Sequence, residues 1–320
     1  MKKVSVLITD YALISAIGNT RYLFNRVNEF LTQSGKSPLF QVQFVGNHKS
    51  IELSNGPYTI QTDATITETA QTDLVIIPPM SGEMIKSINA NKESIIWMHQ
   101  QYQKGAEIAS LCVGAFLLAE TGLLNNRSCS THWVTANNFR SRYPKVNLVD
   151  EKVITDQEGL YTSGGANSYW NLLIYLVEKY AGKEAAVYAS KYFAIDKSRD
   201  DQLLFRMFEG AKNHGDEEIL KIQEYIEAHY ADNITIDQLA ELALLSPRTL
   251  QRRFKAAAHF TIYTYLQKTR IEVAKRLLET RKSTVSEIMF ETGYQNPKAF
   301  RALFKKETGV SPSAYRGKYA

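Results

Sequence analysis

Up to about Tyr192, the hydrophobic positions come in short runs that are separated by longer stretches with helical periodicity. The runs are rich in β-branched and large apolar residues and cover residues 4–8, 40–46, 73–79 and 106–112. Strands that alternate with helices along a chain usually join one parallel sheet. This half of the sequence therefore predicts an α/β domain.

The pattern changes after KNHGDEE, a polar and turn-rich stretch at residues 212–218. Beyond it the β-type runs stop, and Ile219, Ile222 and Ile226 stand at helical spacing. We therefore expect two domains and a connection between them. They are an α/β domain over residues 1–205, a linker over 206–217 and an all-α domain over 218–320.

The helical half contains an internal repeat. TIDQLAELALLSPRTLQRRFK at residues 235–255 matches TVSEIMFETGYQNPKAFRALFK at 284–305, with one extra residue in the second copy. Each copy opens with a capping box and restarts, after a tight turn, with a polar N-cap followed by proline. The pairs are Thr235 with Gln238, Thr284 with Glu287, Ser246 with Pro247 and Asn296 with Pro297. The repeat predicts two helix-turn-helix units.

The second helix of each copy has an apolar face and a polar face. Large apolar residues fall at i and i+4, and so point inward. They are Leu250 with Phe254, and Phe300 with Phe304. The polar residues that point outward are Arg248, Gln251, Arg252, Lys298 and Arg301. Such a helix fits the DNA major groove, where arginine pairs with guanine and glutamine with adenine. These side chains are predicted to contact a double-stranded DNA operator.

The charge distribution supports this prediction. The chain of 320 residues has a formal net charge of +5, but residues 244–320 hold 16 Lys and Arg against 5 Asp and Glu, a net charge of +11. The rest of the chain is therefore near −6. Such asymmetry indicates an anionic partner for the C-terminal part. Because a basic segment is more often a solubilising face, the charge adds to the repeat and does not replace it.

Several classes of protein are excluded by composition and spacing. No apolar run approaches the roughly 20 residues that span a bilayer, and Asp10 ends the first apolar run too early for a signal peptide. Two cysteines, Cys112 and Cys129, provide neither a disulfide framework nor a paired metal-ligand set. We therefore expect a cytoplasmic protein with no membrane partner, no metal and no cofactor.

The helical half resembles the DNA-binding domain of the AraC/XylS family of bacterial regulators over about residues 217–319. The resemblance rests on LSPRTLQRRFK, RIEVAKRLLE and GYQNPKAFRALFKKETGVSPSAYR. It implies two helix-turn-helix units that are joined by a long helix and contact DNA through the outward positions. The copies differ at Ala302, which stands where the first has Arg252, and at TIYTY (261–265), which lacks the proline of SPSAY. The first difference predicts that the second unit reads fewer bases.

Cys112 is the focal point of the N-terminal half. In ASLCVGAFLLAETGLL, at residues 109–124, an apolar run ends at this cysteine, Gly114 follows and a helical pattern begins. A nucleophile elbow has this form, and a helix N-terminus is expected to lower the pKa of such a thiol. A small residue that fits a tight crossing gives the same pattern. The sequence leaves both interpretations open.

Residues 110–133 and 160–182 resemble the ThiJ/PfpI group of class I glutamine-amidotransferase-like domains, and more narrowly the regulators that fuse such a domain to an AraC-type module. The resemblance extends over about residues 2–205. It implies a flavodoxin-like parallel sheet with helices on both faces and a ligand pocket at the strand ends. The residues expected at this pocket are Cys112, Val113, Thr131, His132, Ser163 and Gly164.

Departures from the enzymes of this group argue against catalysis. PfpI-like peptidases carry a histidine directly after the cysteine, where this chain has Val113. Many of the enzymes place a glutamate after the first strand, where this chain offers Asp10, and related regulators carry an aspartate where it has Asn171. His132 is the remaining candidate base for the thiol. A lone histidine beside Trp133 is more often structural.

We therefore expect a sequence-specific transcriptional regulator without catalytic residues. Its α/β domain would sense a small molecule or mediate dimerisation. The expected partners are a DNA operator, a second copy of the chain, a small-molecule effector and RNA polymerase. The competing hypothesis is a Cys-dependent amidohydrolase-like or glyoxalase-like enzyme fused to a DNA-binding module, with Cys112 as the nucleophile.

Overall fold

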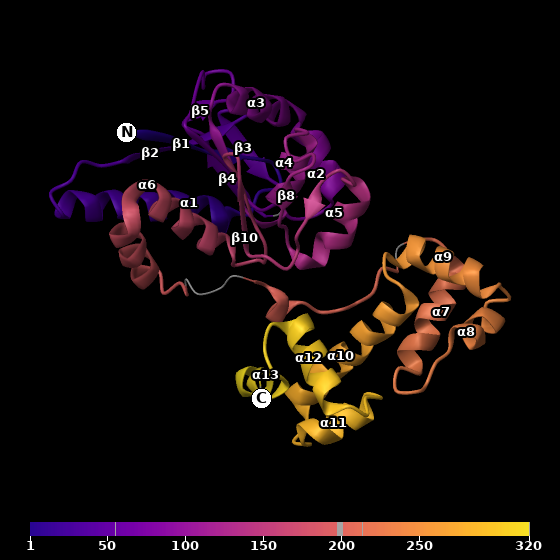
Figure 1. Ribbon diagram of the computed structural model, residues 1–320. Helices are drawn as coiled ribbons and strands as arrows, with labels where there is room; N and C mark the ends of the chain where they lie inside the picture. The colour runs from indigo at the N-terminus through magenta and orange to yellow at the C-terminus, as the bar shows by residue number, and fades with distance from the viewer. Residues whose placement is uncertain (55, 197–200, 213, 320) are drawn as a thin grey trace. The chain divides into compact units, whose positions relative to one another are not determined.

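A computed structural model describes residues 1–54, 56–196, 201–212 and 214–319, and it divides the chain into two compact units (Figure 1). We call them the α/β unit, Met1–Gln202, and the helical unit, Leu203–Ala320. The predicted fold class, an α/β domain followed by an all-α domain, is confirmed. None of the helices in the described ranges is long and apolar enough to cross a membrane.

The α/β unit is built on a central sheet. In the described residues the sheet has seven strands, in the order β10-β11-β7-β6-β1-β2-β5. Their bounds are β1 Lys2–Ile8, β2 Phe40–Gly46, β5 Ala64–Thr65, β6 Leu74–Ile77, β7 Glu107–Ser110, β10 Ile154–Gln157 and β11 Leu160–Ser163. Neighbours pair in parallel, apart from β10 and β11, which pair antiparallel. The predicted runs 4–8, 40–46, 73–79 and 106–112 correspond to β1, β2, β6 and β7.

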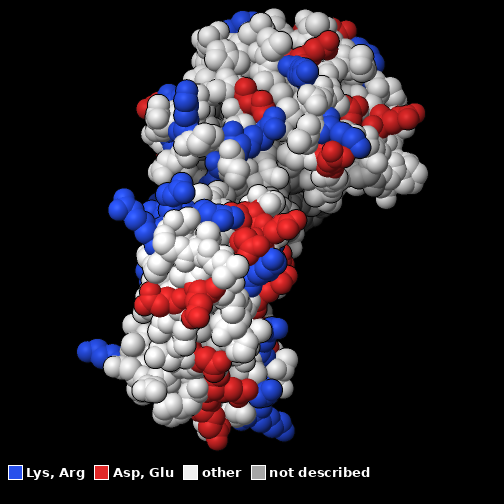
Figure 2. Space-filling view, turned by 90° about the vertical axis from the view of Figure 1, so that its right-hand side faces the viewer, with Lys and Arg blue, Asp and Glu red and all other residues white. Residues whose placement is uncertain are grey.

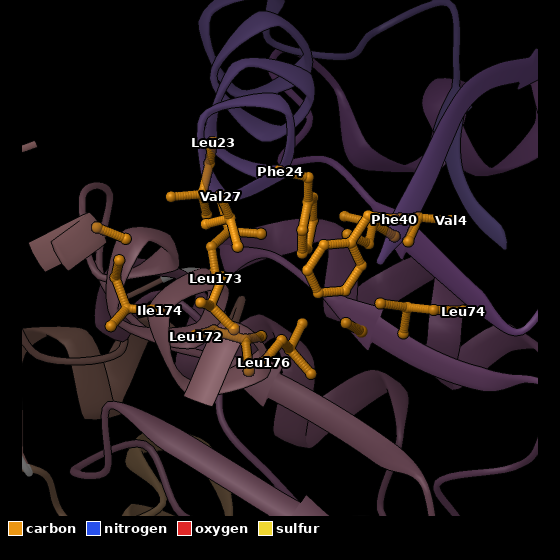
Figure 3. Packing of buried hydrophobic residues seen from close by; sticks show 14 of the residues in the cluster. Val4, Leu23, Phe24, Val27, Phe40, Leu74, Leu172, Leu173, Ile174 and Leu176 are labelled. Atoms are coloured by element: carbon orange, nitrogen blue, oxygen red, sulfur yellow. The ribbon is translucent and has the colours of Figure 1, made fainter. Parts of the chain in front are cut away.

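Helices cover both faces of this sheet, as predicted. Along β6, Leu74 and Ile76 pack against one layer and Val75 and Ile77 against the other, because successive side chains of a strand point to opposite faces. The first layer is α1 (Ile14–Gln33) with α6 (Tyr169–Tyr192), and the second is α3 (Lys92–Gln103), α4 (Ala115–Glu120) and α5 (Ala136–Arg142). Figure 3 shows the first layer, where the ring of Phe24 in α1 lies 4.7 Å from the ring of Phe40 in β2.

Smaller elements complete the α/β unit. They are α2 (Met84–Ala90), the antiparallel pair β3 (Ser50–Leu53) and β4 (Tyr58–Gln61), the parallel pair β8 (Ser128–Cys129) and β9 (Asn147–Leu148), and the short 3-10 helices η1 (Cys112–Gly114) and η2 (Trp133–Thr135).

The helical unit has two hydrophobic cores that share one long helix. Its elements are η3 (Leu203–Phe205), α7 (Glu217–Ala228), α8 (Ile236–Leu242), α9 (Pro247–Ala258), α10 (Ile262–Thr280), α11 (Val285–Glu291), α12 (Pro297–Thr308) and α13 (Pro312–Tyr319). Helices α7, α8 and α9 form the first core with Tyr265 and Leu266 of α10. Helices α11, α12 and α13 form the second core with Val273 and Leu277 of the same helix. The predicted pair of helix-turn-helix units is thus present as α8–α9 and α11–α12.

The capping signals of the repeat act as predicted. Thr235 and Thr284 both form complete capping boxes. Ser246 caps α9, and Asn296 caps α12 by accepting from two backbone N–H groups. Proline follows at the first helical position in both cases. Each unit therefore starts its second helix at a point that the local sequence fixes.

Residues 206–217, expected to be a linker, lie within the helical unit. The ring of Phe208 packs against Phe260 and Tyr265, and its backbone N–H donates to Glu272 at 3.0 Å. The ammonium group of buried Lys275 donates to the backbone carbonyl of Arg206. Hydrophobic packing and these polar contacts hold Arg206 and Phe208 against α10.

The turns of the two helix-turn-helix units share a left-handed residue but differ in its identity. Gly293 has a φ of 80°, and its counterpart Leu244 has a φ of 53° with 93% of its side chain exposed. A left-handed backbone costs a residue other than glycine roughly 1–2 kcal/mol. Leu244 carries this cost without the compensation of burial.

We expect Leu244→Gly to stabilise the helical unit by about 0.5–1 kcal/mol, because the gain exceeds the extra freedom of glycine in the unfolded chain. Gly293→Ala should destabilise it by about 2 kcal/mol or more, because a Cβ there would lie 2.6 Å from the Ala231 carbonyl. Urea unfolding followed by far-UV circular dichroism measures both changes.

Tryptophan fluorescence provides an internal control, since Trp97, Trp133 and Trp170 all belong to the α/β unit. The fluorescence transition should not move in either variant. A lower midpoint for Leu244→Gly would contradict the assignment of strain to this turn.

Candidate functional site

The residues predicted to contact DNA lie on the exposed faces of α9 and α12. Arg248, Gln251 and Arg252 are exposed and stand at i, i+3 and i+4 on α9. Lys298 and Arg301 are exposed and stand at i and i+3 on α12. The fold therefore gathers the side chains of each helix on one face, opposite its buried apolar residues.

Arg253, the arginine next to this set, has a different role. It is half-buried, and its guanidinium forms two hydrogen bonds with Asp216, at 2.5 and 3.1 Å. Asp216 is also the N-cap of α7, and the Arg253 guanidinium lowers the pKa of its carboxyl group. The tripeptide of Gln251, Arg252 and Arg253 thus presents two side chains to solvent and uses the third to fasten α9 to α7.

The charges of the helical unit are segregated. Residues 203–243 hold nine Asp and Glu against three Lys and Arg, whereas residues 244–320 carry the basic excess. Figure 2 shows acidic side chains on one face of this unit with basic side chains beside them, lower in the view. The basic excess of this unit thus lies in the segment that contains α9 and α12.

Cys112 occupies a strained turn directly after β7. Its φ is 54°, a left-handed value that is uncommon for a residue other than glycine. A Cβ on Gly114 would lie 2.9 Å from the Pro78 carbonyl, so the return of the chain into α4 leaves no room for a side chain there. The predicted elbow geometry is present at this cysteine.

Burial decides the acidity of this thiol. Cys112 is 4% exposed, and desolvation raises its pKa to about 12, although the backbone N–H of Val113 donates to the sulfur and acts in the opposite direction. The expectation of a lowered pKa was wrong. Burial destabilises the thiolate by removing it from water, and this effect is larger than the stabilisation that the thiolate gains from the start of η1 and α4.

His132, the candidate base for Cys112, has well-defined contacts of its own. Its Nδ1 accepts from the backbone N–H of Val134 at 3.2 Å, as the N-cap of η2. The ring lies 5.4 Å from that of Trp133, and partial burial lowers the pKa of the imidazole. These contacts hold the imidazole at the start of η2, beside Trp133.

The fold brings other predicted pocket residues to the Cys112 turn. Because β7 and β11 are parallel neighbours, their carboxyl ends meet at one edge of the sheet. The backbone N–H of Cys112 donates to Ser163 Oγ at 3.1 Å, and Thr131 Oγ1 donates to the Cys112 carbonyl at 3.3 Å. Ser163, Gly164 and Thr131 are all buried, and Val113 is half-buried.

The positions that depart from the enzymes have other contacts. The Asp10 carbonyl accepts from the backbone N–H of Ser54 at 2.7 Å, just beyond β1. The Asn171 side chain donates to the Asp196 carbonyl at 2.8 Å and so ties the start of α6 to the chain beyond its end. Among the residues that the structure describes, no cluster of three or more His, Cys, Asp or Glu side chains could hold a metal ion.

Gln202 lies against this group of residues and was missed by the sequence analysis. Its side chain is 1% exposed and contacts Gly164, Gly165 and the backbone of Thr131. No periodicity or motif around residue 202 marks it, because its partners lie far away in the sequence.

Known proteins resemble both units. Residues 2–179 match the DJ-1/PfpI family, and residues 239–318 match a helix-turn-helix domain family. The HTH-type transcriptional regulator GbdR of Pseudomonas aeruginosa is 23% identical over 225 residues, 70% of this chain and 61% of that protein. The HTH-type transcriptional regulator GlxA of Rhizobium meliloti is 26% identical over 215 residues, 66% of this chain and 65% of that protein. The chain thus spans 61% and 65% of the lengths of these two relatives.

Solved structures share the fold. Drosophila melanogaster DJ-1beta superimposes with a TM-score of 0.51 at 18% identity, over 61% of this chain and 98% of that one. A ThiJ/PfpI family protein from Pseudomonas syringae superimposes with a TM-score of 0.51 at 11% identity, over 84% of this chain and 88% of that one. The chain therefore belongs to the DJ-1/PfpI family, and a helix-turn-helix domain of the AraC type follows its α/β domain.

Proposed function

We propose that this protein is a sequence-specific DNA-binding transcriptional regulator. The observation that carries the proposal is the repeated helix-turn-helix unit, in which α9 and α12 expose basic and amide side chains near their N-termini. Two such helices on one chain can enter successive segments of the major groove. Relatives described as HTH-type transcriptional regulators, which align with 66–70% of this chain, support the same function.

The α/β unit acts in this proposal as a regulatory domain without catalysis. The neutral, buried thiol of Cys112 and the structural contacts of His132 supply neither an activated nucleophile nor its base. A small-molecule effector at the strand ends, a second copy of the chain and RNA polymerase are the further partners that we propose.

Genome-wide mapping of bound sites, followed by footprinting of one site with purified full-length protein, tests the proposed function. We expect discrete protected sites with a shared sequence. Protection that spreads evenly over any DNA of the same length would show that the protein binds DNA without sequence specificity, and would refute the proposal.

Arg252→Ala should weaken binding to a footprinted site by about 1–3 kcal/mol and relax the preference at one base pair, because an arginine in the major groove pairs with a single guanine. Arg301→Ala should behave in the same way through α12. Binding is measured at a fixed salt concentration on the cognate site and on single-base variants of it.

Lys221→Ala is the matched control. Lys221 is an exposed cation on α7, paired with Glu218 at 2.9 Å, and lies outside both helix-turn-helix units. The substitution removes one positive charge and leaves α9 and α12 intact, so the preference for particular base pairs should stay unchanged. Equal effects of Lys221→Ala and Arg252→Ala would show that α9 contributes charge alone.

The regulator should act as a dimer through its α/β unit. Linking two modest DNA-binding modules raises avidity without new contacts, so operators should contain two related half-sites. Light scattering coupled to size-exclusion chromatography should give the mass of two chains at micromolar concentration. A monomeric mass both with and without operator DNA would count against this.

Cys112 should be unreactive near neutral pH, because a pKa of about 12 leaves almost no thiolate. Its rate of alkylation by iodoacetamide should rise about tenfold per pH unit beyond pH 9, where a thiol of ordinary pKa has already levelled off. Cys129, which is fully buried, should label more slowly still.

Assays for turnover with the purified protein distinguish a regulator from an enzyme. With panels of amides, isonitriles and 2-oxoaldehydes we expect no turnover, and Cys112→Ser should retain DNA binding. Turnover that disappears in Cys112→Ser and falls sharply in His132→Ala would establish the competing enzyme hypothesis.

A further inference from the structure

Gln202 is held in a cradle of main-chain groups. Its Nε2 donates to the carbonyls of Asp150 at 2.6 Å, Thr131 at 3.0 Å and Lys152 at 3.4 Å. Its Oε1 accepts from the backbone N–H of Gly165 at 2.8 Å. Both ends of the carboxamide are therefore bound, in a site where the side chain is 1% exposed.

The cradle is specific for one chemical group. Several carbonyl oxygens surround Nε2, and one backbone N–H points at Oε1. A primary carboxamide satisfies both sides, because its nitrogen carries two donors and its oxygen accepts. A carboxylate of the same shape would turn an anionic oxygen toward the carbonyls and would be repelled.

The walls of the cradle are also the walls of the Cys112 turn. Thr131 binds Gln202 through its carbonyl and Cys112 through its hydroxyl. Ser163, which accepts from the Cys112 N–H, directly precedes the two glycines that Gln202 contacts. The Cys112 turn and Gln202 therefore contact the same two segments of chain, at Thr131 and at residues 163–165.

Gln202 is also the last residue of the α/β unit. Its backbone N–H donates to the Glu151 carbonyl at 2.7 Å, and Asp201 forms a β-bridge with Lys152. Two residues further on, Leu204 packs on the second core of the helical unit. The bound carboxamide thus fixes the point at which the chain leaves the α/β unit.

We propose that this cradle is a binding site for a primary carboxamide and that Gln202 is its resident ligand, a latch that fastens the connection between the two units to the chain segments around Cys112. The latch itself goes beyond the proposed function and does not depend on DNA binding. Its use in reporting an effector bound at the strand ends rests on that function.

Two unrelated substitutions should open the latch. Gln202→Met keeps the length of the side chain and removes its hydrogen bonds. Gly164→Ala leaves Gln202 intact but places a Cβ 2.6 Å from the carboxamide carbon Cδ, so the flexible side chain must move out. In both variants of the full chain we expect exchange of the Gly165 amide to accelerate by about tenfold or more, since its partner Oε1 is lost.

In Gln202→Met the amide of Gly164 is the internal reference, because it donates to the Val153 carbonyl at 2.8 Å and not to Gln202. In Gly164→Ala, where residue 164 is itself replaced, the reference is the amide of Ser130, which donates to Thr162 Oγ1 at 2.6 Å. Exchange at the reference amide should change much less. Equal acceleration at the reference amide and at Gly165 would indicate general loosening of the region and overturn the proposal. Unchanged exchange at 165 in both variants would overturn it as well.

Chemical rescue tests the ligand class. Gln202→Ala removes the end of the side chain that acetamide can replace, its methyl group standing for Cγ. Acetamide should restore protection of Gly165 in this variant, whereas acetate, the same size but anionic, should not. Rescue by both compounds or by neither would refute a carboxamide site.

A double variant provides the matched control. In Gly164→Ala with Gln202→Ala the added methyl occupies the cradle, so acetamide should no longer restore protection. Far-UV circular dichroism and tryptophan fluorescence confirm that each variant is folded. Because no readout involves DNA, failure of the latch and failure of the proposed function are distinguishable.

Discussion

The burial of one helix against two separate cores is the constraint on which the DNA-binding half depends. The first turns of α10 pack in the core with α7, α8 and α9, and its later turns pack in the core with α11, α12 and α13. A helix of 19 residues is about 28 Å long and stiff, so it forms a rigid connection between the two helix-turn-helix units. Neither core is large, and the ion pair of Arg253 with Asp216 adds a further fastening between α9 and α7.

In the α/β unit the corresponding constraint is the parallel sheet. The carboxyl ends of β7 and β11 meet at one edge, and this places Cys112 beside Ser163 although 51 positions separate them. Gln202, the last residue of this unit in the sequence, packs against the same edge through Gly165 and Thr131. The strained backbone of Cys112 is therefore surrounded by protein on several sides. Strain of this kind persists where the surrounding structure determines it, and here it coincides with a thiol that burial keeps protonated.

The sequence predicted much of this from signals that act within a few residues. Capping boxes and N-cap residues followed by proline gave the starts of α8, α9, α11 and α12, because these hydrogen bonds close over two or three positions. The apolar runs gave β1, β2, β6 and β7. The alternation of strands and helices gave the class of the first domain, and the repeat with its outward basic face gave the class of the second.

The sequence failed where the answer depended on what surrounds a side chain. The position of Cys112 at a turn indicated a lowered pKa, but the extent of its burial, which reverses the direction, is a property of the packed fold. The cradle of Gln202 joins groups 37 to 71 positions away. Arg253 carries the same charge as its neighbour Arg252. Arg253 is half-buried because it bonds to Asp216, whereas Arg252 is exposed. Local hydrogen bonds and periodicity thus determined the elements and the exposed faces, whereas desolvation and distant contacts, which exist once the chain has folded, decided the chemistry of the buried site.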